Sequence, residues 1–209
     1  MEQIILDIIN KFNYLGIAFL IAIENLFPPI PSEVILTSAG FATTVEGVNM
    51  TFVGVVIAST IGAIIGATLL YLIGYILNAD RVAILFESKL AKVLRLKTND
   101  LHKAEAWFNK YETKAVFIGR FIPIVRSLVS IPAGMAKMKF IPFITLTTIG
   151  TFIWNIVLVY LGILAGNNYH VVANYFDLYS NIALIIIIIV ILVLIALFVK
   201  SRFFSKENK

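Results

Sequence analysis

Two long segments of the chain contain no charged residue, and they restrict the fold more than any other feature. They are residues 50–77 and 140–165, which are 28 and 26 residues long. About 20 consecutive apolar residues are enough for an α-helix to cross the hydrocarbon core of a bilayer. A third uncharged segment, 181–199, is uniformly apolar and predicts a C-terminal transmembrane helix. The sequence therefore predicts an all-α integral membrane protein.

Composition and charge support this class. The mean hydropathy is +0.94 and 14% of residues are charged, which excludes an ordinary soluble domain. Without cysteine, the chain has no disulfides and no thiolate metal sites. Basic residues concentrate in 79–114, which holds eight of the 17 Lys and Arg, and in the tail from Lys200. The positive-inside rule places both in the cytoplasm and 167–180 outside. Because topology explains these basic segments, and acids interleave in 79–114, we expect no nucleic-acid partner.

Two further apolar stretches, 14–45 and 115–136, are interrupted at their centres by proline and by charge. The first contains ENLFPPIPSE (24–33) and the second contains GRFIPIVR (119–126). Each half is about ten residues, or roughly 15 Å of helix, which is half a bilayer. Proline removes a backbone donor and favours a turn, and bent backbone at that depth must be buried in protein or line a cavity. Both stretches are therefore predicted to be re-entrant helical hairpins, with turn and packing residues Pro28, Pro29, Pro31, Pro123, Gly40 and Gly134.

A polar segment precedes the second stretch. Apolar residues recur at helical spacing from Leu101 to Tyr111, after a cap at Asn99 or Asp100. This pattern predicts an amphipathic helix at the membrane interface, and docking to a partner protein is the alternative.

The two broken stretches also match one another. Placing Pro29 on Pro123 superposes Gly40 on Gly134, and a shorter connection in the second copy superposes Gly62 on Gly150 and Gly74 on Gly162. Each unit is predicted to contain an interfacial helix, a hairpin and a long span, and a single span separates the units. The second unit must then enter from the opposite face, which is an inverted repeat. The predicted organisation is one membrane domain, 1–209, with a first repeat at 1–78, a cytoplasmic basic connection at 79–98, a second inverted repeat at 99–166, a C-terminal transmembrane helix at 181–199 and a cytoplasmic basic tail at 200–209.

Four charged residues flank the two predicted tips: Glu24 and Glu33 in the first, Arg120 and Arg126 in the second. A lone charge at that depth costs at least a few kcal/mol, so we expect the acids of one tip to meet the arginines of the other. A purely structural ion-pair cluster is the alternative. A functional site is favoured because hydrophobic residues would join the tips without the desolvation cost.

The residue types indicate the chemistry of this site. Arginine suits bidentate phosphate binding, so Arg120 and Arg126 are predicted to bind a phosphate headgroup. Glu24 and Glu33 are predicted to be proton acceptors or counter-ions, because a phosphate that competes for the arginines would leave the carboxylates free to take up protons. Two serines next to the tips offer further hydrogen-bond donors, with helix capping as the alternative role: Ser32 and Ser127.

The two tip sequences resemble the two signatures of the DedA family of membrane proteins. These signatures are ENLFPPIPSE (24–33) followed by Ala39-Gly40, and GRFIPIVR (119–126) followed by Pro132-Ala133-Gly134. The resemblance covers about 12–165. It implies two opposed re-entrant hairpins and lipid transport, including the return of undecaprenyl phosphate in bacterial envelope synthesis. Members similar to this chain are also associated with phosphatidylethanolamine movement.

The resemblance also implies that the essential acids and arginines of the family correspond to Glu24, Glu33, Arg120 and Arg126. One departure is Ser32-Glu33, where many members have Gly-Asp. The longer arm of glutamate changes where its carboxylate lies.

The predicted function is a lipid-phosphate flippase of the bacterial cytoplasmic membrane. It would return undecaprenyl phosphate from the outer to the inner leaflet, with proton coupling. The alternatives are a phosphatidylethanolamine or phospholipid flippase or scramblase, and a proton-coupled small-ion or drug exchanger, although a cation carrier gains little from two fixed arginines. A homodimer and the side of the N-terminus are left open.

An enzyme is not expected. The two histidines, His102 and His170, lie outside the hairpins, and the sequence has no paired aspartates for a metal. The sequence therefore predicts no catalytic residue, metal or cofactor.

Overall fold

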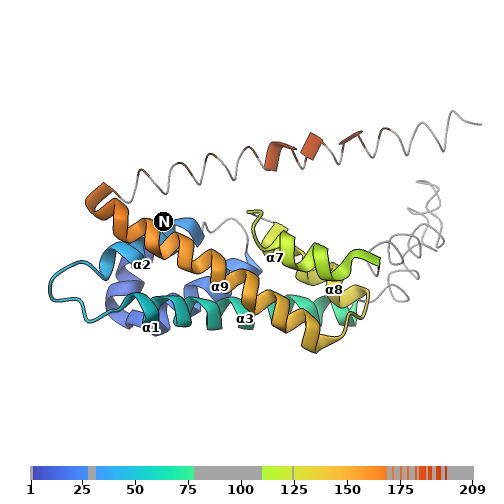
Figure 1. The fold of residues 1–209 in the computed structure, drawn as a ribbon, viewed down its shortest axis with the longest axis horizontal. Helices are drawn as coiled ribbons and strands as arrows, with labels where there is room; N and C mark the ends of the chain where they lie inside the picture. The colour runs from blue at the N-terminus through green and yellow to red at the C-terminus, as the bar shows by residue number, and fades with distance from the viewer. Residues whose placement is uncertain are drawn as a thin grey trace, which may run out of the picture.

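The computed structural model describes residues 2–27, 32–77, 110–123 and 125–168, with single residues and short groups between 171 and 196. All regular secondary structure in these residues is helical, as the sequence predicts. Among the described residues, three helices are long and apolar enough to cross a membrane, so the chain is a multi-pass membrane protein. They are α1 (Glu2–Leu26), α3 (Phe52–Ile76) and α9 (Phe140–Ala165) (Figure 1).

The first long helix, α1, is divided by one residue with non-helical geometry. Asn13 has φ 49° and ψ −127°, a left-handed φ that asparagine tolerates better than most residues. Before the break, Ile5 and Ile9 are buried while the residues around them are more exposed, as in a helix with one apolar face. After it, 14–26 is about 20 Å long at helical rise, which is shorter than the hydrocarbon core of a bilayer.

At each predicted tip the helix is interrupted and one or more shorter helices follow. In the first stretch, α2 (Ser32–Ala42) begins a few residues after α1 ends and packs against it. In the second, residues 110–119 are helical and end in a turn that includes Pro123. The short helices α7 (Val125–Leu128) and α8 (Ser130–Met135) then lead into α9.

The helix α2 packs against α9, and α8 packs against α3, so each pairs with the long helix of the other predicted repeat (Figure 1). The α2–α9 pair and the α3–α8 pair each contain two glycines at which a Cβ would collide with a backbone carbonyl oxygen of the facing helix. Small residues of this kind allow close helix packing in membranes. The contacts are Gly40 with Val159, Gly162 with Thr37, Gly134 with Tyr71, and Gly74 with Ile131. Since the sequence match superposes Gly40 on Gly134 and Gly74 on Gly162, the two helix pairs make equivalent contacts.

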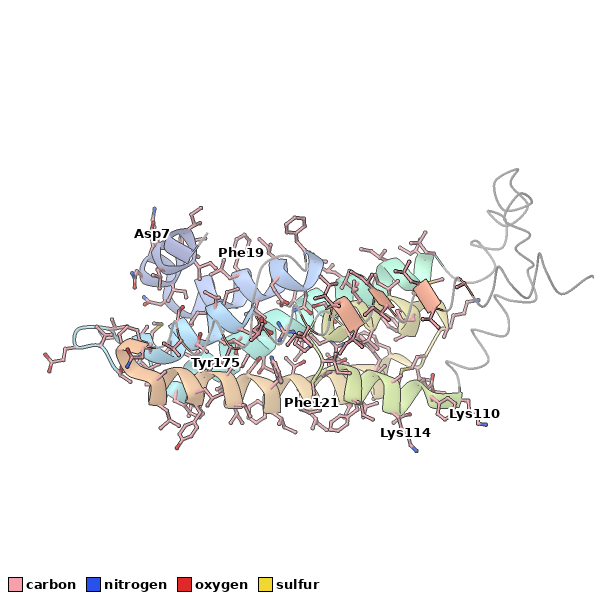
Figure 2. The ribbon with its side chains drawn as sticks, turned by 90° about the horizontal axis from the view of Figure 1, so that it is seen from above. Asp7, Phe19, Lys110, Lys114, Phe121 and Tyr175 are labelled. Atoms are coloured by element: carbon pink, nitrogen blue, oxygen red, sulfur yellow. The ribbon has the colours of Figure 1, made fainter. Side chains whose placement is uncertain are left out.

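The outer surface is apolar along the length of the molecule. Figure 2 shows Phe19 pointing outward, whereas Asp7 and Lys110 lie towards opposite ends. Leu15 and Ile141 are 78% and 70% exposed. Apolar exposure of this extent is expected of a surface that faces lipid.

Several predicted segments lie outside the described residues. They are Pro28, Pro29 and Pro31, the basic connection 79–98, the interfacial helix up to residue 109, the two histidines, most of 181–199 and the tail 200–209.

Candidate functional site

An ion pair joins the two predicted tips. Glu24 lies in the last turn of α1 and Arg126 lies in α7. The two residues are only 4% and 9% exposed. One guanidinium nitrogen, Nη2 of Arg126, donates a hydrogen bond to Oε1 of Glu24 at 2.8 Å. The same nitrogen contacts Oγ of Ser32 at the start of α2. A single arginine therefore holds both sides of the first tip.

The second arginine, Arg120, is held by neutral oxygens. Its Nη1 donates to the carbonyl oxygen of Arg126 at 2.6 Å, and its Nη2 donates to Oγ of Ser130 at 3.0 Å and to Oγ1 of Thr147 at 2.8 Å. The residue is 2% exposed, and its Nε is buried without a hydrogen-bond partner. Within the part of the chain that the structure describes, no carboxylate lies within 4.0 Å of this guanidinium. The predicted meeting of acids and arginines therefore occurs at Arg126, while Arg120 is a buried cation among neutral groups.

Aromatic rings cover both guanidinium groups. The Cζ of Arg120 lies 5.8 Å from the ring centroid of Phe143, and the Cζ of Arg126 lies 5.9 Å from that of Trp154. A cation over an aromatic face is attracted by the ring quadrupole, which partly offsets the loss of water around it.

The remaining predicted residues, Glu33 and Ser127, are also buried. Glu33 is in the first turn of α2, where the positive end of the helix dipole favours a carboxylate. Among the described residues, its carboxylate forms no hydrogen bond or ion pair. Ser127 is next to Arg126 in α7. All six predicted polar residues are thus in or beside the region where the two tips meet.

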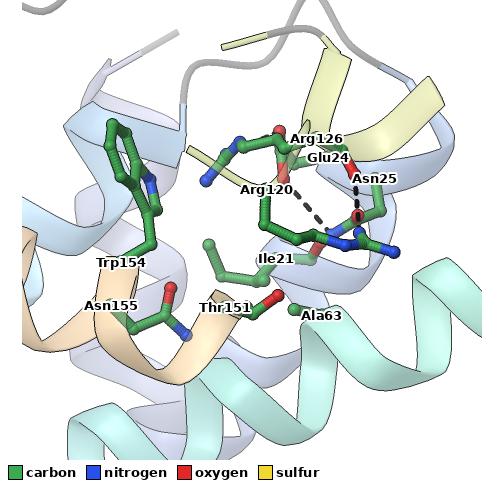
Figure 3. A pocket seen from close by; sticks show the side chains of 9 residues that line it. All are labelled: Ile21, Glu24, Asn25, Ala63, Arg120, Arg126, Thr151, Trp154 and Asn155. Atoms are coloured by element: carbon green, nitrogen blue, oxygen red, sulfur yellow. Dashed lines mark hydrogen bonds and ion pairs between the residues drawn. The ribbon is translucent and has the colours of Figure 1, made fainter. Parts of the chain in front are cut away.

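A small cavity lies among these side chains (Figure 3). Its volume is about 10 Å³, which is room for about one water molecule. A phosphate group is larger, so binding one requires the tips and the helices around them to separate. The lining residues are Ile21, Glu24, Asn25, Ala63, Arg120, Arg126, Thr151, Trp154 and Asn155.

Sequence reasoning missed the polar residues that α9 contributes. Thr147 binds Arg120, Thr151 and Asn155 line the cavity, and Asn155 Nδ2 donates to Oγ1 of Thr60 at 3.1 Å. A signal was present, because Thr147, Thr151 and Asn155 recur every four residues in an uncharged span and so share one helix face. Asn25, beside Glu24, was also missed.

The site does not resemble a metal centre. Among the described residues, no group of three or more His, Cys, Asp and Glu side chains could hold a metal ion. The two acids and two arginines carry opposite formal charges of equal size, so the site can accept an anion most readily if a carboxylate is neutralised at the same time.

Comparison with known proteins assigns the family. A VTT domain model matches residues 30–164. An alkaline phosphatase-like protein of Lactococcus lactis (strain IL1403) is 51% identical over 99% of this chain and 95% of its own length. Undecaprenyl phosphate transporter A of Staphylococcus aureus is 38% identical over 90% of this chain and 91% of its own, and the protein of that name from Bacillus subtilis is 37% identical over 87% and 86%. No solved structure matches the chain. The match from the start of α2 through α9, together with these relatives, shows that the chain belongs to the VTT-domain family of membrane proteins, the DedA family that the tip sequences resemble.

Proposed function

We propose that this protein carries a lipid phosphate across the bacterial cytoplasmic membrane, and that it returns undecaprenyl phosphate from the outer to the inner leaflet. The observation that carries the proposal is the pair of buried arginines between the tips, one of which lacks a carboxylate partner. Relatives named undecaprenyl phosphate transporter A in two bacteria support this choice of lipid.

An anionic ligand would complete the bonding of the arginines. Arg120 has a buried Nε without a partner, and a buried charge without a counter-ion is costly. A phosphate oxygen would supply both the missing acceptor and the missing negative charge. Arginine in this role binds phosphate with parallel hydrogen bonds, which a small cation cannot accept and for which a neutral drug supplies no compensating negative charge.

The proposed architecture is an inverted repeat of two re-entrant hairpins whose tips meet near the midplane of the membrane. The equivalent glycine contacts of the α2–α9 and α3–α8 pairs support it. So do the lengths of 14–26 and α2, which are about 20 Å and 17 Å at helical rise. Helix breaks at membrane depth are tolerated where they are enclosed by protein, and the helices that flank the tips pack against α3 and α9.

The test of function is reconstitution in vesicles with one labelled lipid at a time. We expect labelled undecaprenyl phosphate to leave the outer leaflet faster than in protein-free vesicles, and labelled phosphatidylethanolamine to move no faster than in that control. Movement of phosphatidylethanolamine alone would contradict the proposal. Because some relatives are named alkaline phosphatase-like, inorganic phosphate is measured in the same samples. Release of phosphate from the lipid would point to an enzyme instead.

The orientation in the membrane can be tested with single cysteines. The chain contains no native cysteine, so each variant carries one reactive thiol. Cysteine in place of Ser201 is expected to react with an impermeant reagent only after the membrane is permeabilised, because the basic tail is proposed to be cytoplasmic. Cysteine in place of Asn168 is expected to react in intact cells. The reverse pattern would overturn the proposed topology.

Proton coupling follows from competition for Arg126. A phosphate that binds this arginine displaces Glu24, and the buried carboxylate is then stabilised by taking up a proton. If the proton is taken up outside and released inside, an acidic exterior should raise the rate of inward lipid transport severalfold.

Glu24→Gln, which keeps the shape but not the charge, is expected to bind lipid and to lose the response to the gradient. The measurement is lipid movement in vesicles with and without an imposed pH gradient. A wild-type rate that ignores the gradient would leave the acids as counter-ions only.

A further inference from the structure

The cavity between the tips has a second polar wall, which lies on α9 one helical turn beyond Thr147, the residue that binds Arg120. Figure 3 shows Thr151 and Asn155 on one side of the space and Arg120 and Arg126 on the other. Trp154 completes this face. The three residues of α9 follow the i, i+3, i+4 spacing of a single helix face, and none of them is charged.

The residues of this wall differ from those at the equivalent positions of the first predicted repeat. The superposition of Gly62 on Gly150 also places Thr151, Trp154 and Asn155 on three small residues of α3, which are Ala63, Gly66 and Ala67. On α3, the small residues allow close packing: a Cβ on Gly66 would collide with Asn25 and Ala22 of α1. If α9 only repeated the packing of α3, small residues would be expected at these positions too. Close helix packing therefore does not explain the polar side chains on α9.

The hydroxyl of Thr151 differs from those of its neighbours on α9. Thr145 and Thr148 each donate a hydrogen bond to the carbonyl oxygen four residues earlier, at 2.9 Å and 2.8 Å, which is the usual arrangement for threonine in an apolar helix. Within the described residues, the hydroxyl of Thr151 forms no hydrogen bond, although the residue is only 7% exposed. An unbonded hydroxyl that lines a buried cavity is costly unless a ligand or water uses it.

Asn155 also has hydrogen-bonding capacity to spare. One N–H of its amide is used by Thr60, while a side-chain amide offers two N–H donors and a carbonyl acceptor. The residue is 1% exposed and lines the cavity, so a ligand in the cavity can use these groups.

We propose that Thr151 and Asn155 are ligands of the transported phosphate group, and that they add hydrogen bonds from α9 to those of the arginines. The proposal rests on the proposed function. A phosphate monoester has three unesterified oxygens that can accept hydrogen bonds and a diester has two, so each added donor favours the monoester. The wall should therefore discriminate between a phosphate monoester, which has one substituent, and a diester, which has two.

The experiment measures binding of farnesyl phosphate, a monoester, to the purified full chain in detergent, with a short-chain phosphatidylglycerol as the diester competitor. Thr151→Val keeps the shape and removes only the hydroxyl. We expect it to weaken farnesyl phosphate binding about tenfold, the effect of one hydrogen bond to a charged group, and to lower the preference over the diester. Thr151→Ser, which restores a hydroxyl, is expected to recover most of the affinity. Asn155→Leu should lower affinity and preference in the same direction.

Two controls separate ligand binding from packing. Thr145→Val makes the same chemical change on the exposed face of α9 and should leave binding unchanged. Thr60→Val removes the partner of Asn155 but not the wall, so it should affect thermal stability more than the preference between the two lipids. Wild-type affinity and preference in both Thr151→Val and Asn155→Leu would overturn this inference alone. Failure of the wild type to bind farnesyl phosphate or to move undecaprenyl phosphate would overturn the proposed function with it.

Discussion

Replacing Arg126 with lysine is expected to reduce lipid transport about a hundredfold, the equivalent of two charge-assisted hydrogen bonds, while the chain still inserts in the membrane. Lysine keeps the positive charge, so Glu24 retains a counter-ion. It cannot reproduce the planar fork with which arginine binds a phosphate, nor hold Glu24 and Ser32 together as one guanidinium does. The measurement is the rate of undecaprenyl phosphate movement in vesicles, normalised to the amount of inserted protein.

Lysine is a sharper substitution here than alanine. Arg126→Ala would leave Glu24 buried without its partner, and breaking a buried pair costs about 3–5 kcal/mol in stability, which would confuse misfolding with loss of binding. The matched control is Lys114→Arg, which exchanges the same two side chains at an exposed position and should transport normally. Normal transport by a well-folded Arg126→Lys protein would reduce this arginine to a generic positive charge.

The second large effect is expected from the glycines between the helix pairs. In Gly134→Ala the new Cβ would collide with the carbonyl oxygen of Tyr71, and in Gly40→Ala with that of Val159. Both contacts are with backbone, which cannot rotate away. The free energy of unfolding of each variant should therefore fall by about 1–3 kcal/mol, and each should melt at a lower temperature in detergent.

The control is Gly119→Ala, because a Cβ there would have its nearest neighbour, a side-chain carbon of Val129, at an ordinary 3.4 Å. It should melt close to wild type. The comparison also tests the repeat: equivalent packing of the two helix pairs predicts similar losses at Gly40 and Gly134. A severe loss at one glycine and none at the other would contradict that equivalence.

The long helices could be predicted from the sequence because an uncharged apolar run of sufficient length has few alternatives to spanning a membrane. The interruption of the helix near Pro123 could also be predicted, because proline lacks a backbone N–H donor. The division of α1 at Asn13 agrees with the predicted boundary between an interfacial helix and the stretch 14–45, but its geometry, a single positive φ, could not be predicted, since it depends on how the flanking helical segments pack.

The candidate site was predictable in its residue types but not in its pairing. Charges beside the prolines indicated that Glu24 and Arg126 would be near the tips. Which acid meets which arginine depends on the rotation and depth of each tip, and no local pattern records those. For the same reason no sequence pattern indicated that Arg120 would bind Ser130 and Thr147 rather than a carboxylate.

The small volume of the cavity has a consequence for the cell that makes this protein. A space of about 10 Å³ holds about one water molecule, and a single water cannot form a file along which protons hop from one face of the membrane to the other. The ion pair of Glu24 with Arg126 lines the same space. We therefore expect that this space, in this arrangement, does not conduct protons, so that the proton-motive force is not dissipated through it between one transport event and the next.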